Sequence, residues 1–340
     1  MKAAVIPEVN GTWELREVPT PRPGPGDVLV RVRACGVCHN DVLATRGIIP
    51  FPAITPAITG HEPAGEVVEV GPGVTSREVG DRVGTTWIRG TCGRCDYCRR
   101  NPPLSGQAAF LCAAPTSTGF TVQGGHAEYM VVQADQTVLI PDRLAFELAA
   151  PVLCAGYTGW SALRVADPQP HERVAVLGIG GVGHLALQFS RACGFETIAI
   201  TRSADKHTLA KELGADAVVA SGEQLRAAGG ADVILVTGNS YEAAADSLHG
   251  LRPNGRIVLA GIDATGPFTI APALIYPFFA LGHQVRGATH NGLPYLREAL
   301  DLVAAGQVTP RIEVFDKEHV ADAVEKVARG DVRFRAVVTY

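Results

Sequence analysis

The sequence predicts an α/β plus β protein, with a barrel-like antiparallel β domain and a second domain built on a doubly wound parallel sheet. Up to about residue 145, short runs alternate apolar and polar residues and are broken by Gly and Pro, which is typical of antiparallel strands. From about residue 146 to 285, apolar strands alternate with helical segments, which predicts βα repeats. A length of 340 residues also favours two domains over a single core.

The expected elements follow these patterns in order. In the first region the alternating runs cover 27–34, 64–71 and 126–132. In the second region we expect strands over 173–178, 197–201, 231–237 and 255–261, and helices over 182–194 and 206–215. The remaining chain has mixed character, with amphipathic helices over 295–306 and about 318–329 and a strand over 334–339.

The charge balance argues against nucleic acid and membranes as partners. The net charge is −4, and the lysines, which number only five, form no basic patch. The N-terminal stretch meets Pro7 and Glu8 before an apolar signal segment develops, and the apolar run at 270–282 is interrupted by prolines and too short to span a bilayer. We therefore expect a cytoplasmic protein, in which clustered cysteines indicate metal binding or catalysis more than disulfides.

A glycine-rich loop follows the strand expected at 173–178. Gly178, Gly180 and Gly183 have GxGxxG spacing, and Gly181 and Val182 lie between the last two. Between a strand and a helix, this pattern predicts a dinucleotide site, where backbone amides and the helix N-terminus face a pyrophosphate. The alternative is an ordinary tight βα turn.

The next strand ends where dinucleotide-binding units choose their cofactor. An NAD-binding unit usually has a carboxylate here, but this chain has Thr201, Arg202 and Ser203, with Lys206 shortly after. No carboxylate would repel a 2'-phosphate, and Arg202 with Ser203 can bind one, so we expect NADP(H) in preference to NAD(H). Alternatively, Arg202 is solvated and the protein accepts either cofactor.

The stretch "CGRCDYC" and the later "FLC" predict a structural zinc site. Cys92, Cys95 and Cys98 are separated by two residues each, and Cys112 follows after thirteen more. Four thiolates on short loops can surround one zinc at about 2.3 Å in a closed tetrahedral site. A redox dithiol or free cysteines are the alternatives.

A second zinc constellation is suggested by "ACGVCHND" at 34–41. A catalytic zinc needs three protein ligands, and the candidates are Cys38, His61 in "TGHEPAG" and Cys154 in "PVLCAGYTG". Because these segments are distant in sequence, spacing alone leaves a metal site and ordinary packing both open.

The motifs taken together resemble the zinc-dependent alcohol dehydrogenases of the medium-chain dehydrogenase/reductase superfamily, over essentially the whole chain. The matching stretches are "CGVCHND", "GHEPAGEVVEVGPGV", "VGDRV", "CGRCDYC", "GGHAEY", "LCAGYTGWSAL" and "VLGIGGVGHLALQ". The resemblance implies a GroES-like barrel domain made of residues 1–150 and 286–340, with a Rossmann domain of residues 151–285 inserted between them. It also implies that Cys38, His61 and Cys154 hold the catalytic zinc, a ligand set of two cysteines and one histidine. A homodimer or homotetramer is expected because the family's Rossmann domains usually associate.

The resemblance assigns further roles. Asp41 matches a carboxylate that orients the zinc-bound His61, and Glu62 matches a carboxylate behind the metal. His39 matches a basic residue on the cofactor pyrophosphate, and Thr158 a residue against the nicotinamide. Each residue also has an alternative without a functional role. Asp41 and Glu62 would then be loop carboxylates, His39 a surface imidazole and Thr158 a hydroxyl at the start of a helix. Cys35 and Cys193 match no ligand position, and we expect both to be small buried hydrophobes.

Two departures from the family pattern stand out. Asn40 occupies the place of a Ser or Thr that takes the alcohol proton, and Leu43 that of a relay His, so water, His39 or Glu62 are the candidates for proton release. The loop from Cys98 to Cys112 holds thirteen residues where the family usually has seven. The extra length costs only about 0.5 kcal/mol of loop-closure entropy, so we expect the structural site to persist.

The expected reaction is hydride transfer between NADP(H) and a small alcohol, aldehyde or ketone at one of two zincs per chain, with reduction favoured. The aromatic residues Trp87, Phe110, Phe120 and Trp160 are candidates for an apolar substrate pocket or for core. Rival interpretations are a reductase of an activated C=C or C=N bond with an idle zinc, and a non-enzymatic zinc- and nucleotide-binding scaffold.

Overall fold

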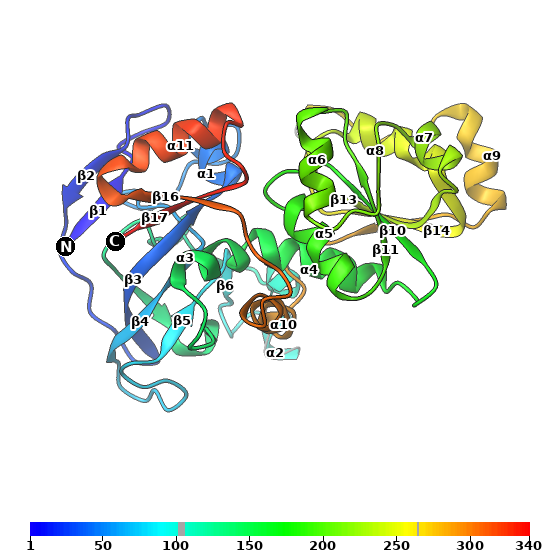
Figure 1. Ribbon diagram of the computed structural model, residues 1–340. Coiled ribbons are helices and arrows are strands. Elements are labelled where there is room, and N and C mark those ends of the chain that lie inside the picture. The colour runs from blue at the N-terminus through cyan, green and yellow to red at the C-terminus, as the bar shows by residue number, and fades with distance from the viewer. Residues whose placement is uncertain (101–105, 264) are drawn as a thin grey trace. The chain divides into compact units, whose positions relative to one another are not determined.

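The computed structural model describes residues 1–100, 106–263 and 265–340. These divide into two compact units (Figure 1). The first unit contains residues 1–154, 290–304 and 310–340, and the second contains residues 155–289 and 305–309. The first unit therefore carries both chain ends. The chain passes between the units at 154/155, 289/290, 304/305 and 309/310, whereas the family resemblance implied only 150/151 and 285/286.

The first unit is organised around the long strand β3 (Asp27–Val37). This strand pairs antiparallel with β4 (Pro63–Val70), β8 (Tyr129–Gln133) and the C-terminal strand β17 (Arg335–Thr339). The strand order of its seven-stranded sheet is β16–β17–β3–β4–β5–β9, with β8 also on β3. The remaining strands of this unit are β1 (Lys2–Val5), β2 (Glu14–Glu17), β5 (Arg82–Gly84), β6 (Ile88–Gly90), β7 (Thr116–Ser117), β9 (Val138–Leu139) and β16 (Ile312–Asp316).

Alternation along β3 produces the core of this unit. Val28, Val30 and Val32 point to one face and pack with Val67 of β4 and Val83 of β5. The helices are α1 (His39–Thr45), α2 (Asp96–Arg100), α3 (Phe146–Ala149), α10 (Leu293–Ala304) and α11 (Val320–Arg329). Helix α11 packs against α1, which begins where β3 ends (Figure 1).

The second unit is a six-stranded, entirely parallel sheet in the order β12–β11–β10–β13–β14–β15. Its strands are β10 (Arg173–Leu177), β11 (Glu196–Ile200), β12 (Ala217–Val219), β13 (Ala231–Val236), β14 (Leu251–Leu259) and β15 (Gln284–Gly287). The chain order reverses between β10 and β13, which is the switch point where doubly wound sheets bind ligands.

The helices of this unit are α4 (Ala155–Ala166), α5 (Gly183–Ala192), α6 (Asp205–Glu212), α7 (Gly222–Ala227), α8 (Tyr241–Ser247) and α9 (Pro272–Ala280). Helix α4 precedes β10, and the other helices connect successive strands of the sheet. Ala175 and Leu177 of β10 pack in one core cluster with Leu225 of α7 and Ala244 of α8, whereas the alternate Val174 points to the opposite face and is equally buried. Burial on both faces explains why the central strands β10 and β13 consist mainly of apolar residues. The predicted fold class, with its β domain and doubly wound parallel sheet, is confirmed.

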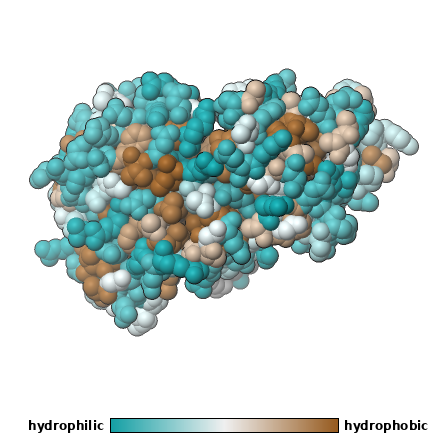
Figure 2. Space-filling view, viewed as in Figure 1, coloured by the Kyte–Doolittle hydropathy of each residue, from teal (hydrophilic) through white to brown (hydrophobic). Residues whose placement is uncertain are grey.

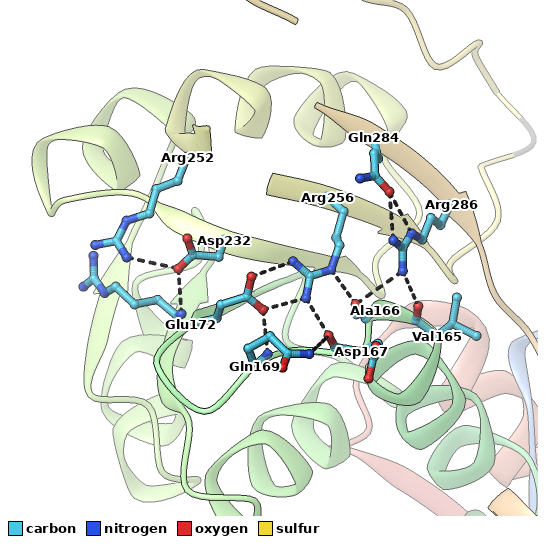
Figure 3. Close-up of polar contacts among 11 residues, drawn as sticks. Val165, Ala166, Asp167, Gln169, Glu172, Asp232, Arg252, Arg256, Gln284 and Arg286 are labelled. Carbon is cyan, nitrogen blue, oxygen red and sulfur yellow. Dashed lines mark hydrogen bonds and ion pairs between the residues drawn. The ribbon is translucent and has the colours of Figure 1, made fainter. Parts of the chain in front are cut away.

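A buried arginine of β14, the strand next to the edge strand β15, joins three segments of the second unit (Figure 3). Arg256 of β14 is 6% exposed and makes two bonds to the Glu172 carboxylate, at 2.9 and 2.6 Å. Its guanidinium also donates to the carbonyls of Ala166 and Asp167. The end of α4, the loop before β10 and the middle of β14 are thereby held together.

The surface is mainly hydrophilic on the face seen in Figure 2, where hydrophobic residues gather in separate patches. Among the described residues, no helix combines the length and apolar character needed to cross a bilayer.

Candidate metal and cofactor sites

Cys38 and Asp41 lie where β3 gives way to α1. Cys38 is the N-cap of the helix, and its amide donates to Asp41 Oδ2 at 2.9 Å. Asp41 is completely buried, and its other oxygen lies 3.4 Å from the Gly60 amide and 3.7 Å from His61 Nδ1. Although burial opposes it, the charge of His61 lowers the pKa of Asp41. The carboxylate can therefore orient the imidazole from behind.

His61 and Glu62 immediately precede β4 and are both fully buried. Glu62 Oε1 is paired with the guanidinium of Arg335 on β17. Gly36 of β3 permits this placement, because a Cβ there would lie 1.9 Å from Glu62 Oε2. Burial raises the pKa of Glu62 to about 7, although Arg335 opposes the rise. Arg335 was not anticipated from the sequence, since it lies 273 positions from Glu62.

The sulfur of Cys154 completes this cluster. Donor atoms of Cys38, His61, Glu62 and Cys154 all lie within 4.8 Å of one another. The two sulfurs are 4.0 Å apart, too far for a disulfide bond of about 2.05 Å but close to the roughly 3.8 Å between two thiolates that share a tetrahedral zinc.

The charges and unpaired atoms of the cluster also suit a cation. Both ring nitrogens of His61 and Oε2 of Glu62 are buried without a hydrogen-bond partner among the described residues. Hydrogen bonding with the Cys154 thiol, together with the charge of His61, lowers the pKa of Cys38 well below its usual value, which favours a thiolate. The donor set of two sulfurs, one imidazole and a nearby carboxylate therefore fits zinc.

Aromatic rings lie beside His61. The ring centroid of Phe120 is 5.9 Å and that of Trp87 6.2 Å from the imidazole, and Phe110 packs edge-on against Trp87 at 5.8 Å. Trp160, the fourth aromatic candidate, packs against Phe189 in the second unit, with ring centroids 5.3 Å apart. Of the two roles considered for it, substrate pocket or core, this contact fits the core.

The four cysteines of the predicted structural site also converge. The sulfurs of Cys92, Cys95, Cys98 and Cys112 lie within 4.8 Å of one another, around the short helix α2. Backbone amides donate to several of them: the Cys92 amide donates to Cys112 Sγ at 3.3 Å. Hydrogen bonds from the amides of Ala113 and Cys98 lower the pKa of Cys95 to about 6. Residues 101–105 of the extended loop lie outside the described residues.

The glycine loop follows β10 at the switch point of the parallel sheet. A Cβ at Gly183 would lie 2.0 Å from the Gly178 carbonyl oxygen, so only glycine allows α5 to start this close to the strand. A Cβ at Gly180 would meet nothing within 4 Å, which leaves open space where a pyrophosphate is expected to approach. Gly181 and Val182 complete the loop, and Val182 is the N-cap of α5. The loop therefore fits a dinucleotide.

The residues expected to select the cofactor follow β11. Thr201 is buried, and its hydroxyl accepts a hydrogen bond from the Ser203 amide at 3.3 Å. Arg202 and Ser203 are exposed, and Lys206 is half-buried in the first turn of α6. Two cationic side chains are thus accessible at the end of β11, and Asp205 is the nearest carboxylate in sequence.

The remaining predicted residues have the following places. His39 is exposed and Asn40 half-buried in the first turn of α1, and Leu43 is half-buried one turn later. Thr158 lies in α4 of the second unit and is 8% exposed.

The expectation that both remaining cysteines are buried was right for one of them. Cys35 is fully buried, but Cys193 is exposed because α5 ends there, before Gly194 turns the chain with a φ of +83°.

Comparisons with known proteins agree with this architecture. Residues 24–142 match the family described as alcohol dehydrogenase GroES-like domain, and residues 181–305 match zinc-binding dehydrogenase. An alcohol dehydrogenase of Geobacillus stearothermophilus is 40% identical over 99% of both chains. Among solved structures, a cinnamyl alcohol dehydrogenase from Sorghum bicolor is 30% identical, with a TM-score of 0.87 over 99% of this chain and 97% of that one.

Two further solved structures contain nicotinamide cofactors. A Helicobacter pylori enzyme named CAD, complexed with NADP(H), has a TM-score of 0.85 at 26% identity and covers 99% of this chain and 97% of its own. An acetophenone reductase from Geotrichum candidum, in complex with NAD, has a TM-score of 0.82 at 26% identity and covers 100% and 97%. With the GroES-like and Rossmann units and near-complete coverage by named relatives, this chain belongs to the zinc-type alcohol dehydrogenases of the medium-chain dehydrogenase/reductase superfamily, a family of oxidoreductases.

Proposed function

We propose that the protein interconverts an alcohol and an aldehyde or ketone by hydride transfer with NADP(H), with reduction favoured. The observation that supports this most is the cluster of Cys38, His61 and Cys154, whose two sulfurs form no disulfide and whose imidazole nitrogens have no hydrogen-bond partner among the described residues, as suits a zinc ion. When bound, zinc would polarise the substrate carbonyl or lower the pKa of an alcohol, and the nicotinamide would exchange the hydride.

The surrounding side chains have distinct roles in this proposal. Asp41 orients His61 and holds the Cys38 amide, and Glu62 adds a carboxylate whose charge Arg335 balances. Asn40 can donate a hydrogen bond to the substrate oxygen, but an amide does not readily pass on a proton. Proton release would then use water, His39 or Glu62.

The substrate class follows from the rings beside His61. An apolar surface beside the imidazole is formed by Trp87, Phe110 and Phe120. This surface favours the binding of aromatic or branched aliphatic aldehydes and excludes water from the bound substrate.

The cofactor assignment is NADP(H), with NAD(H) as the alternative. The loop of Gly178, Gly180 and Gly183 would hold the pyrophosphate, and Arg202, Ser203 and Lys206 the 2'-phosphate. His39 would contact the pyrophosphate and Thr158 the nicotinamide. The four-cysteine cluster would hold a second, structural zinc, since four thiolates leave no position for substrate.

Metal content and cofactor-dependent turnover test this function together. We expect two zincs per chain and faster reduction of a panel of aliphatic and aromatic aldehydes with NADPH than with NADH. Turnover that persists after zinc chelation would favour a reductase of C=C or C=N bonds, and no turnover with either cofactor would favour a zinc- and nucleotide-binding scaffold. Turnover with NADH alone would overturn the cofactor assignment.

The proposed assembly is a homodimer or homotetramer, formed through the edge of the parallel sheet. Helix α9 has no buried residue, and its Tyr276 and Phe279 are 76% and 82% exposed. Beside it, β15 is the edge strand and carries Val285, which is 41% exposed. An apolar helix, together with an edge strand that pairs only with β14 among the described residues, suits association with a second copy. Because the thiolate ligands need reducing conditions, we place the protein in the cytoplasm.

A further inference from the structure

A buried hydroxyl and a buried imidazole lie against the segment that carries Cys154. Thr86 follows β5 and is 2% exposed, and His290 follows β15 and is 1% exposed. Thr86 Oγ1 donates to the carbonyl of Leu153 at 2.6 Å and lies 3.2 Å from His290 Nδ1. The His290 ring also hydrogen-bonds the backbone of Cys154. Two consecutive residues of the Cys154 segment are therefore held by side chains from two other parts of the first unit.

Thr86 is itself fixed from a third segment. Thr118, which is completely buried, donates its hydroxyl proton to the Thr86 carbonyl at 2.9 Å. Because these groups are buried, a lost partner would leave a carbonyl without a hydrogen bond. Breaking one of these hydrogen bonds therefore costs more free energy than breaking an exposed hydrogen bond of the same length.

Cys154 needs such a network because it lacks the support that the other two proposed zinc ligands have. Cys38 and His61 both have Asp41 behind them, whereas Cys154 lies between the 3-10 helix Ala150–Leu153 and α4, far from that carboxylate in sequence. A shift of its backbone would change the 4.0 Å separation of the two sulfurs on which tetrahedral binding depends.

We propose that Thr86 and His290 are positioning residues for the zinc ligand Cys154. They hold the backbone at Leu153 and Cys154. The distance between the sulfurs of Cys154 and Cys38 thereby stays at a value at which both can bind one zinc. This inference rests on the proposed function, in which Cys154 binds the catalytic zinc. Side chains that orient metal ligands in this way typically change metal affinity by about 10- to 100-fold when they are lost.

Cobalt(II) substitution tests the proposal without relying on activity. Thr86→Val removes the hydroxyl at nearly constant volume, and Thr86→Ser keeps it. Thr137→Val is the matched control, because Thr137 is also a buried threonine of the first unit whose hydroxyl donates to a carbonyl, that of Ala134 at 2.7 Å. The absorption bands of thiolate-bound cobalt and the rate of cobalt loss to a chelator are recorded for each protein.

We expect Thr86→Val to shift the cobalt bands and to release one of its two cobalts at least about tenfold faster, while Thr86→Ser and Thr137→Val stay within about twofold of the parent. A Thr86→Val protein identical to the parent overturns the proposal, as does an equal change in all three variants. The four-cysteine cluster contributes the same bands to every protein, so the difference spectra report on the other site.

A second pair of variants covers the case in which Thr86→Val does not fold. His290→Phe keeps the ring volume without nitrogen, and His290→Asn keeps a donor and an acceptor. Faster release in His290→Phe than in His290→Asn supports the proposal, and parental behaviour of both overturns it. A parent that binds only one cobalt per chain would overturn the proposed function as well, whereas two cobalts with unaltered variants would overturn this inference alone.

Discussion

Asn40 is the residue whose chemistry differs most from what alcohol oxidation requires. It is half-buried in the first turn of α1, two positions after Cys38. A serine there would supply a hydroxyl that can accept and pass on the substrate proton, as a general acid or base does at a gain of about 100-fold or more. We therefore expect Asn40→Ser to raise kcat for alcohol oxidation at pH 7 at least about tenfold, measured by NADPH formation.

The control for this change is Asn40→Ala, which removes the amide without adding a hydroxyl and should leave oxidation slow. Equal rates in the serine and alanine variants would mean that the proton leaves by another route, such as water, His39 or Glu62.

Arg202 decides the cofactor in our interpretation. Its guanidinium is exposed at the end of β11, where a 2'-phosphate would accept charge-assisted hydrogen bonds worth about 1.5–3 kcal/mol. Arg202→Ala should therefore lower kcat/KM for NADPH by about tenfold or more and leave kcat/KM for NADH within about twofold. Lys211→Ala, which removes an exposed cation from the same region, should change neither value. An equal loss with both cofactors would contradict the assignment.

At the residue scale, local spacing explains what the sequence could predict. Cys92, Cys95 and Cys98 are separated by only two residues each and Cys112 follows after thirteen more, so their convergence follows from composition and spacing. Arg335 could not be predicted, because only the pairing of β17 with β3 brings it to Glu62. Thr86 and His290 are separated by 204 positions and carry no motif, so they too required the structure.

At the scale of elements, the Glu172–Arg256 pair gives a pH-dependent prediction (Figure 3). Hydrogen bonding to Arg256 lowers the pKa of Glu172 below its unfolded value of about 4.3. A lowered carboxyl pKa contributes stability above the unfolded pKa, and this contribution disappears as the pH falls through the folded pKa. We expect Glu172→Gln to lower the free energy of unfolding by about 1–3 kcal/mol at pH 7, measured by urea denaturation.

The difference between parent and Glu172→Gln should shrink as the pH is lowered below about 4. The control is Glu223→Gln, whose partner Arg226 and own side chain are 63% and 73% exposed, so its effect should stay within about 0.5 kcal/mol. A Glu172→Gln effect that is constant across this pH range would show that the pair acts through packing rather than charge.

Element prediction succeeded where periodicity was long and regular. Strands β10, β11, β13 and β14 of the parallel sheet and helices α5 and α10 were expected within a few residues of their observed ends, whereas β12 and β15 were not expected. The two- to four-residue strands such as β5 and β9 exist only through their partners, and no local pattern indicates them. The sequence also gave no indication that the proline-interrupted run at 270–282 forms helix α9, with Pro272 in its first turn and Pro277 inside it.

At the scale of the whole molecule, that helix and the neighbouring strand determine the expected assembly. The edge of β15 is followed by no further strand among the described residues, and α9 beside it presents Ile275, Tyr276 and Phe279 outward at 58%, 76% and 82% exposure. Two copies related by a twofold axis can pair these edge strands and cover both helices at once, which buries the same surface on each chain. An isolated chain would expose this apolar surface to water.

We therefore expect the parent to be at least dimeric by light scattering, and Phe279→Asp to shift it toward monomer, because two carboxylates would be buried at the twofold contact without partners. Val79→Asp is the control, since Val79 is also an exposed apolar residue, at 62%, but lies in the first unit. A Phe279→Asp protein that remains fully assembled would place the contact on another surface.

If monomerisation left cobalt content and spectrum unchanged, each chain would hold its metals by itself, which is what a cluster built entirely from residues of the first unit requires.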